Sequence, residues 1–120
     1  MSNQSLGRAG EEAAADFLRQ KGYEILARNY RARVGEIDLI AWQKPRTLIF
    51  VEVKTRHGDS FGQPALAVNF HKKQKIIMTA HWYLRENRRE DCYIRFDVVE
   101  VYAMPGGTFR LRHYESAFEA

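Results

Sequence analysis

The chain has 120 residues, of which 45% are hydrophobic and 28% charged, so a wholly disordered chain is excluded. A chain of this length buries roughly two-thirds of its unfolded surface, and we expect one domain over residues 1–120. The single Cys92 excludes an intramolecular disulfide and favours a cytoplasmic protein, while the lack of a long apolar run argues against a signal peptide or a membrane span. The net charge of +4 favours a polyanionic partner.

The expected elements follow in the order αβββαββ. A helix is predicted over residues 7–21, with Gly22 ending it, and two strands over 23–31 and 34–42 follow. A hairpin loop at 43–46 leads into a strand over 47–55, and a polar loop over 56–64 comes next. Apolar residues at seven-residue steps predict a helix of about five turns that is capped by Asn69. Two strands over 93–102 and 108–114 complete an α/β or α+β chain.

Acidic residues interrupt the apolar faces of two expected strands. The strands over 34–42 and 47–55 carry apolar residues on both faces, which indicates central strands covered on both sides. If their hairpin turns symmetrically about Pro45, Asp38 lies opposite Glu52 and Glu36 opposite Lys54, with Cβ atoms about 5 Å apart. This cluster depends on the register, because a slip by one residue turns each side chain to the other face.

Glu11 adds a third carboxylate, because it falls within the apolar stripe of the first expected helix. A helix packed over the charged part of the sheet would bring Glu11 to Asp38 and Glu52. Carboxylates about 5 Å apart repel by ~3 kcal/mol at an effective dielectric of 20, and Lys54 balances one of the three charges. A cation that prefers oxygen ligands, Mg²⁺ or Mn²⁺, would balance the rest. The alternative is a structural role for each acid, bonded to the backbone or paired with Lys or Arg.

Five segments resemble the YraN family of small bacterial proteins: GRAGEEAAADFL, GYEILARNYR, GEIDLIA, FVEVKTR and RFDVVEV. Within them, GEID at 35–38, EVK at 52–54 and Glu11 are similar to the motif of the PD-(D/E)xK nuclease superfamily, with Ile37 where the motif has proline. The resemblance implies a restriction-endonuclease-like α/β core, in which helices flank a mixed central sheet. It also implies a similarity to archaeal Holliday junction resolvases.

The resemblance further implies a role for each motif residue. Asp38, Glu52 and the carbonyl of Val53 would hold Mg²⁺ or Mn²⁺, and Lys54 would orient the attacking water and stabilise charge on the phosphate. Glu11 would be an outer ligand or hold a metal-bound water. Two further residues are accessory candidates: Glu36 and Gln74.

Basic residues are expected to bind the nucleic-acid backbone, with strong salt dependence and little sequence preference. They flank the acidic strands or open the second helix: Arg28, Arg31, Arg33, Arg56, Lys72 and Lys73. The expected function is a cytoplasmic, metal-dependent endonuclease for branched or structured DNA in repair or recombination, dimeric if two cuts are made symmetrically. Two alternatives stay open: a nucleic-acid-binding module with this fold and no hydrolytic activity, and a protein-interaction adaptor.

Overall fold

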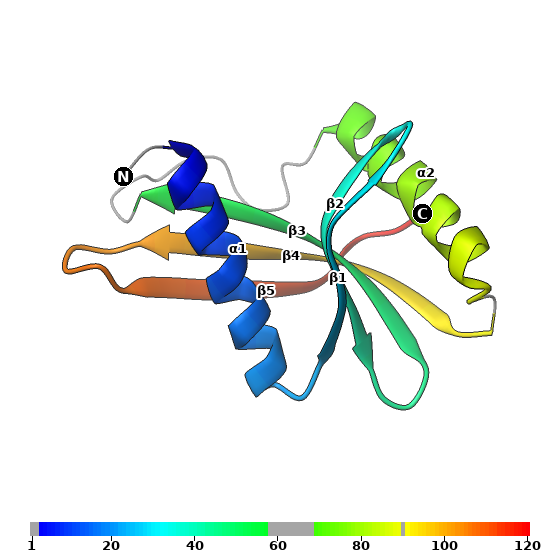
Figure 1. Ribbon diagram of the computed structural model, residues 1–120, viewed down its shortest axis with the longest axis horizontal. Coiled ribbons are helices and arrows are strands. Elements are labelled where there is room, and N and C mark those ends of the chain that lie inside the picture. Colours follow the sequence, from blue (N-terminus) through cyan, green and yellow to red (C-terminus); the bar gives the residue numbers. More distant parts are fainter. Residues whose placement is uncertain (1–2, 58–68, 90) are drawn as a thin grey trace.

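A computed structural model describes residues 3–57, 69–89 and 91–120 of the protein (Figure 1). Its elements are α1 (Asn3–Gln20), β1 (Glu24–Ala32), β2 (Gly35–Gln43), β3 (Thr47–His57), α2 (Phe70–Asn87), β4 (Tyr93–Ala103) and β5 (Phe109–Phe118). The predicted order αβββαββ is confirmed, and the fold is α/β, with one mixed five-stranded sheet and two helices.

The strands lie in the order β1-β2-β3-β4-β5. Neighbours pair antiparallel except β3 and β4, which are parallel. Parallel neighbours need a crossover connection, and α2 lies between these two strands in the chain. Figure 1 shows α1 crossing β3, β4 and β5, whereas α2 lies beside the hairpin of β1 and β2. The central position predicted for β2 and β3 is thereby confirmed.

Helix α1 covers one face of the sheet, where a buried cluster joins it to the strands β2, β3 and β4: Ala14, Ala15, Leu18, Tyr23, Leu39, Ala41, Ile49, Val51, Val99 and Val101. The helix lies close to β3 at Gly10, where an added Cβ would overlap the side chain of Thr55. Gly22, with a φ of 94°, ends the helix as predicted, because its N–H donates to the carbonyl of Arg19 and the next N–H to that of Leu18.

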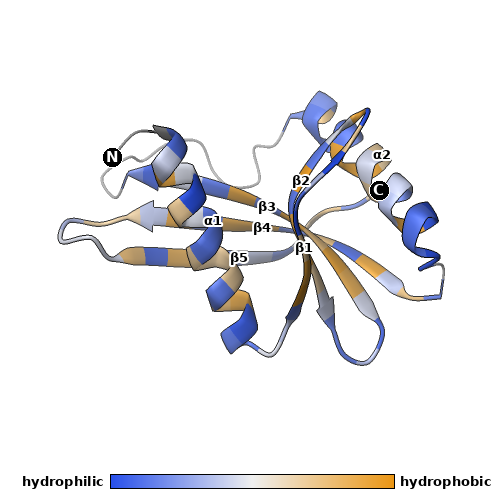
Figure 2. Ribbon diagram, in the orientation of Figure 1, coloured by the Kyte–Doolittle hydropathy of each residue, from blue (hydrophilic) through white to orange (hydrophobic). Residues whose placement is uncertain are grey.

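Helix α2 packs on the opposite face, where the buried residues are Ile37, Ile40, Leu48, Phe50, Ile76, Ala80, Tyr83, Phe96 and Phe118. Figure 2 shows hydrophobic residues along the central strands between these two layers. The predicted cap is present, since the side chain of Asn69 accepts from the backbone N–H of Lys72. Gly35 lets β2 approach α2, since an added Cβ would lie 2.9 Å from Oγ1 of the buried Thr79.

Three predicted boundaries differ from the structure by more than one residue. Helix α1 begins at Asn3 rather than at residue 7. Strand β3 continues to His57 because its pairing with β4 extends to that residue, so residues 56 and 57 belong to the strand and not to the predicted loop, and the rest of the predicted loop lies outside the described residues. Strand β5 continues to Phe118, whose ring stacks on Phe96. Among the described residues, no helix combines the length and apolar character needed to cross a bilayer.

Candidate active site

The hairpin register places the two acidic residues of the motif side by side. The ladder of β2 and β3 runs from Gln43↔Thr47 to Leu39↔Val51, as the symmetric turn predicted. Beyond it, Oδ2 of Asp38 accepts a hydrogen bond from the backbone N–H of Val53 at 2.7 Å. The ladder therefore ends one residue before Asp38 and Glu52, which we call the acidic pair.

Asp38 and Glu52 line one cavity of about 350 Å³ between the start of β2, the middle of β3 and the first turns of α2. The other lining residues are Gly35, Glu36, Val53, Lys72, Lys75 and Ile76. Glu52 is buried, with 9% of its surface exposed. The cavity thus combines the adjacent carboxylates of Asp38 and Glu52 with the Glu36 side chain, a peptide group and two lysines.

The pKa of Asp38 is raised from 3.8 to about 7. Burial is the largest cause and the charge of Glu52 the next, while the hydrogen bond from Val53 opposes them. The charge of Glu11 adds to the rise and that of Lys72 reduces it. A buried carboxylate beside a second one is an environment that a cation stabilises.

Lys72 lies against the acidic pair, which the sequence did not indicate. Its Nζ is 2.7 Å from Oε1 of Glu52, although 48% of the lysine side chain is exposed. Burial lowers the pKa of Lys72, but the hydrogen bond to Glu52 and the charges of Glu52, Asp38 and Glu36 raise it overall. The available signal was the cap at Asn69, because it fixes Lys72 in the first turn of α2.

Lys54 is half-buried on β3, two residues after Glu52. Burial lowers its pKa, and the charges of Lys72 and Arg56 lower it further, against the opposing charges of Glu52 and Glu100. Arg56 lies 3.5 Å from the buried Glu100, and its Nε, itself buried, has no hydrogen-bond partner among the described residues. Lys54 therefore stands in a crowded positive environment at the edge of the acidic pair.

Glu11 lies in a different cavity, of about 300 Å³, under α1. Val53 borders both cavities, and Thr55 and His57 complete the β3 side of this one. Within residues 3–57, 69–89 and 91–120, no three His, Cys, Asp or Glu side chains gather as a group that could hold a metal. The three-carboxylate cluster expected from the sequence is therefore a pair, with Glu11 beyond Val53.

Glu36 does not reach Lys54 through the ladder, which stops before that pair. Instead its carboxylate pairs with Arg31 at 3.0 Å, on the neighbouring strand. Arg28 is likewise engaged, at 2.7 Å from Glu12 of α1. With Arg56 beside Glu100 and Lys72 beside Glu52, four of the six basic residues expected to bind a backbone have acidic partners within the chain.

The remaining basic candidates lie in two places, the turn between β1 and β2 and helix α2. Arg33 is exposed in that turn. Lys73 lies over the ring of Phe118, 5.8 Å from its centroid, whereas Lys75 borders the acidic cavity. Gln74 is exposed on α2 and does not line that cavity.

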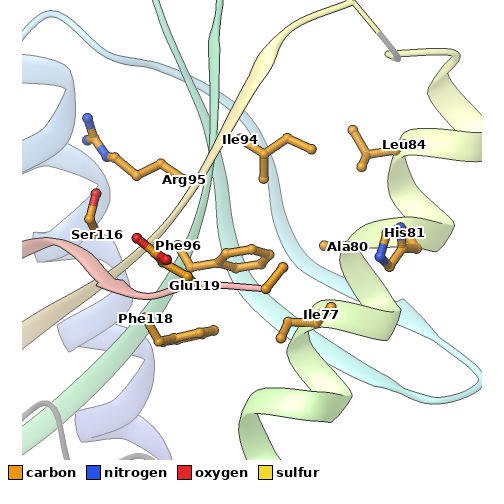
Figure 3. A pocket seen from close by; sticks show the side chains of 11 residues that line it. Ile77, Ala80, His81, Leu84, Ile94, Arg95, Phe96, Ser116, Phe118 and Glu119 are labelled. Carbon is orange, nitrogen blue, oxygen red and sulfur yellow. The ribbon is translucent and has the colours of Figure 1, made fainter.

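A third cavity, of about 260 Å³, lies between α2, β4 and the C-terminal residues. Figure 3 shows the rings of Phe96 and Phe118 and the side chain of Ile77 in its wall. Among its lining residues, Glu119 is the single side-chain carboxylate. The acidic pair of Asp38 and Glu52 lies in the 350 Å³ cavity between β2, β3 and α2, so that cavity is the candidate active site.

The family model described as "Uncharacterised protein family UPF0102" matches residues 10–101. A UPF0102 protein of Symbiobacterium thermophilum is 50% identical over 115 residues, which are 96% of this chain and 97% of the relative. One from Nocardia farcinica is 50% identical over 115 residues, 96% of this chain and 90% of the relative. One from Syntrophotalea carbinolica is 48% identical over 115 residues, 96% of this chain and 92% of the relative. The matched range contains all the residues of the acidic cavity.

Proposed function

The chain belongs to the UPF0102 family, and we propose that it is a divalent-metal-dependent endonuclease that hydrolyses phosphodiester bonds in structured or branched DNA. The observation that carries the proposal is the adjacency of Asp38 and Glu52 in one cavity, with Lys54 two residues further along β3. Under the proposal the chain is a member of the PD-(D/E)xK superfamily, similar to Holliday junction resolvases, and a single nuclease domain of the cytoplasm.

The oxygen donors of the cavity fit Mg²⁺ or Mn²⁺. Mg²⁺ keeps several of its waters and is usually held by one or two carboxylates together with substrate phosphates. Asp38 and Glu52 would hold it, with the carbonyl of Val53 as a third donor. The cation would supply Lewis-acid stabilisation of the phosphoryl oxygens and acidify a bound water. Glu11, in the neighbouring cavity, would act through water rather than directly.

Lys54 would stabilise the negative charge that builds on the phosphate during hydrolysis. Hydrolysis forms a bond from the water oxygen to phosphorus and breaks the bond to the leaving sugar oxygen, which takes up a proton. An ammonium group aimed at the phosphate stabilises the added negative charge. Because burial and two neighbouring cations lower the pKa of Lys54, its proton is held less tightly than that of an ordinary lysine.

Exposed basic residues around the cavity would hold the DNA backbone. Arg33, Lys72 and Lys75 are exposed, whereas Arg28 pairs with Glu12 and Arg56 is largely buried beside Glu100. Phosphate contacts of this kind position a strand without reading its bases. The substrate would thus be chosen by its shape. Symmetric cutting of a four-way junction would require a homodimer with a twofold axis.

The experiment is cleavage of labelled DNA in Mg²⁺, Mn²⁺ or EDTA. The panel contains a duplex, a single strand, a flap and a four-way junction, with an RNA hairpin for comparison. We expect metal-dependent cuts within strands, fastest on a branched DNA, and abolished in Asp38→Ala. Salt-sensitive binding without cleavage would favour the alternative of a binding module. Absence of binding at low salt would favour a protein-interaction adaptor.

A further inference from the structure

Resting on the proposed function, we propose that Lys72 is the built-in counter-ion of the acidic pair, which occupies the cation's place beside Glu52 and which a divalent cation must displace. Lys72 then sets the metal affinity of the site. This role differs from that of a backbone-binding lysine, because it acts before any nucleic acid is bound.

The contact itself is the first support. Nζ of Lys72 lies 2.7 Å from Oε1 of Glu52, at the distance of a strong charge-assisted hydrogen bond. The Glu52 side chain is 10% exposed, so its charge would otherwise be buried without a partner. Removing one partner of a buried ion pair leaves an uncompensated charge, so Lys72 stabilises the folded protein by neutralising Glu52.

The position of the ammonium is the second support. Lys72 borders the same cavity as both carboxylates, and its charge acts on Asp38 as well as on Glu52. A divalent cation held by these two carboxylates would stand within a few ångströms of that ammonium and be repelled by it. Metal binding must therefore break the contact between Lys72 and Glu52, and nearly half of the lysine side chain is exposed and able to move out.

The other lysines near the cavity lack this contact. Lys75 borders the cavity, and Lys54 is near enough for charge interactions, but within the described ranges neither has an ion pair with Asp38 or Glu52. Lys73, the next residue of α2, is turned toward Phe118. Lys73 is thus a matched control on the same helix turn.

The test is titration of the metal-free protein with Mn²⁺ alone, followed by calorimetry, for the wild type, Lys72→Met and Lys73→Met. Loss of one positive charge beside the cation should tighten Mn²⁺ binding about tenfold in Lys72→Met, and Lys73→Met should stay within about twofold of the wild type. Thermal unfolding gives a second readout, because Mn²⁺ should raise the unfolding temperature more in Lys72→Met than in the wild type.

If Lys72→Met does not fold without metal, Lys72→Gln removes the charge and keeps a hydrogen-bond donor for Glu52. Unchanged or weaker Mn²⁺ binding in the variant that folds would overturn the role of Lys72, even if the wild type cleaves DNA. Tighter Mn²⁺ binding in a protein that cleaves nothing would support the role of Lys72 and count against the nuclease. The two proposals are thereby tested separately.

Discussion

The carboxylate of Asp38 accepts a hydrogen bond of 2.7 Å from the backbone N–H of Val53 at the end of the β2–β3 ladder. A side chain thus does what a backbone carbonyl does elsewhere in a sheet, which fixes Asp38 beside Glu52. The same contact aligns the peptide of Val53 with the two carboxylates. The aspartate consequently has a structural role and a proposed chemical role, which substitutions can separate.

Asp38→Asn and Asp38→Ala should differ in stability and agree in activity. Asparagine keeps an oxygen that can accept from Val53 and removes a buried charge, so the free energy of unfolding should hold or rise. Alanine leaves the Val53 N–H unpaired, at a cost of about 1–3 kcal/mol. Urea unfolding in EDTA measures the first quantity and DNA cleavage the second. Equal stability of the two variants would contradict the structural role.

The raised pKa of Asp38 predicts a pH dependence of stability. Because the folded pKa of about 7 exceeds the ordinary value of 3.8, the folded state binds more protons between these pH values. In EDTA, the stability that protonation gives is complete below the ordinary pKa and is lost as the pH rises through about 7. Unfolding of the wild type and Asp38→Asn across this range should show the fall in the wild type alone. Parallel curves would refute this assignment.

Asp97 should show the opposite pH dependence. It is fully buried, and burial would raise its pKa, but hydrogen bonds from His113, Arg95 and the N–H of Ser116 hold the pKa below its ordinary value. The stability that ionised Asp97 contributes is therefore present above the ordinary pKa of an aspartate. It is lost in acid, as the pH falls through the lowered pKa that Asp97 has in the folded protein.

Asp97→Asn should lower the free energy of unfolding by about 3 kcal/mol, since it leaves Arg95 without its buried partner. The matched control is Asp91→Asn, because that side chain is fully exposed and its removal should leave stability unchanged. Both are measured by urea unfolding at neutral pH. An equal loss of stability in the two variants would contradict the stabilising role of the hydrogen bonds between Asp97 and His113, Arg95 and Ser116.

Gly10 should not tolerate alanine, because the new Cβ would overlap Oγ1 and Cγ2 of Thr55. We expect a loss of about 1–3 kcal/mol from overpacking between α1 and β3. Adding Thr55→Ala removes both of these atoms and should restore part of the stability. Thermal unfolding of the two single variants and the double variant measures this coupling. A double variant no more stable than Gly10→Ala would be inconsistent with the close approach.

Much of the fold was predictable because local signals agreed with the tertiary structure. The loop around Pro45 fixed the register of β2 and β3, and Gly22 and Asn69 end and begin helices where the sequence predicts. The last strand was predicted too short. Its continuation depends on the stacking of Phe118 on Phe96 and on the contact of Ser116 with Asp97, which are tertiary contacts without a local signal.

The site was predictable where it depends on one hairpin and not where it depends on two helices. Strand alternation and register suffice to bring Asp38 near Glu52. Whether Glu11 reaches them depends on how α1 sits on the sheet, and the close contact at Gly10 holds it on the far side of Val53. Lys72 reaches Glu52 because α2 packs over β2, which no sequence pattern specifies.

Cleavage of the preferred DNA in Mg²⁺ by the wild type, Asp38→Asn and Asp16→Asn tests the central claim most directly. Asp16 is the matched control, since it is exposed on α1 and pairs with Arg19. We predict that Asp38→Asn, folded as judged by its unfolding transition, cuts at least about a hundredfold more slowly than the wild type. Asp16→Asn should cut at the wild-type rate. Cleavage by folded Asp38→Asn at the wild-type rate would contradict the assignment of the acidic pair as the catalytic centre.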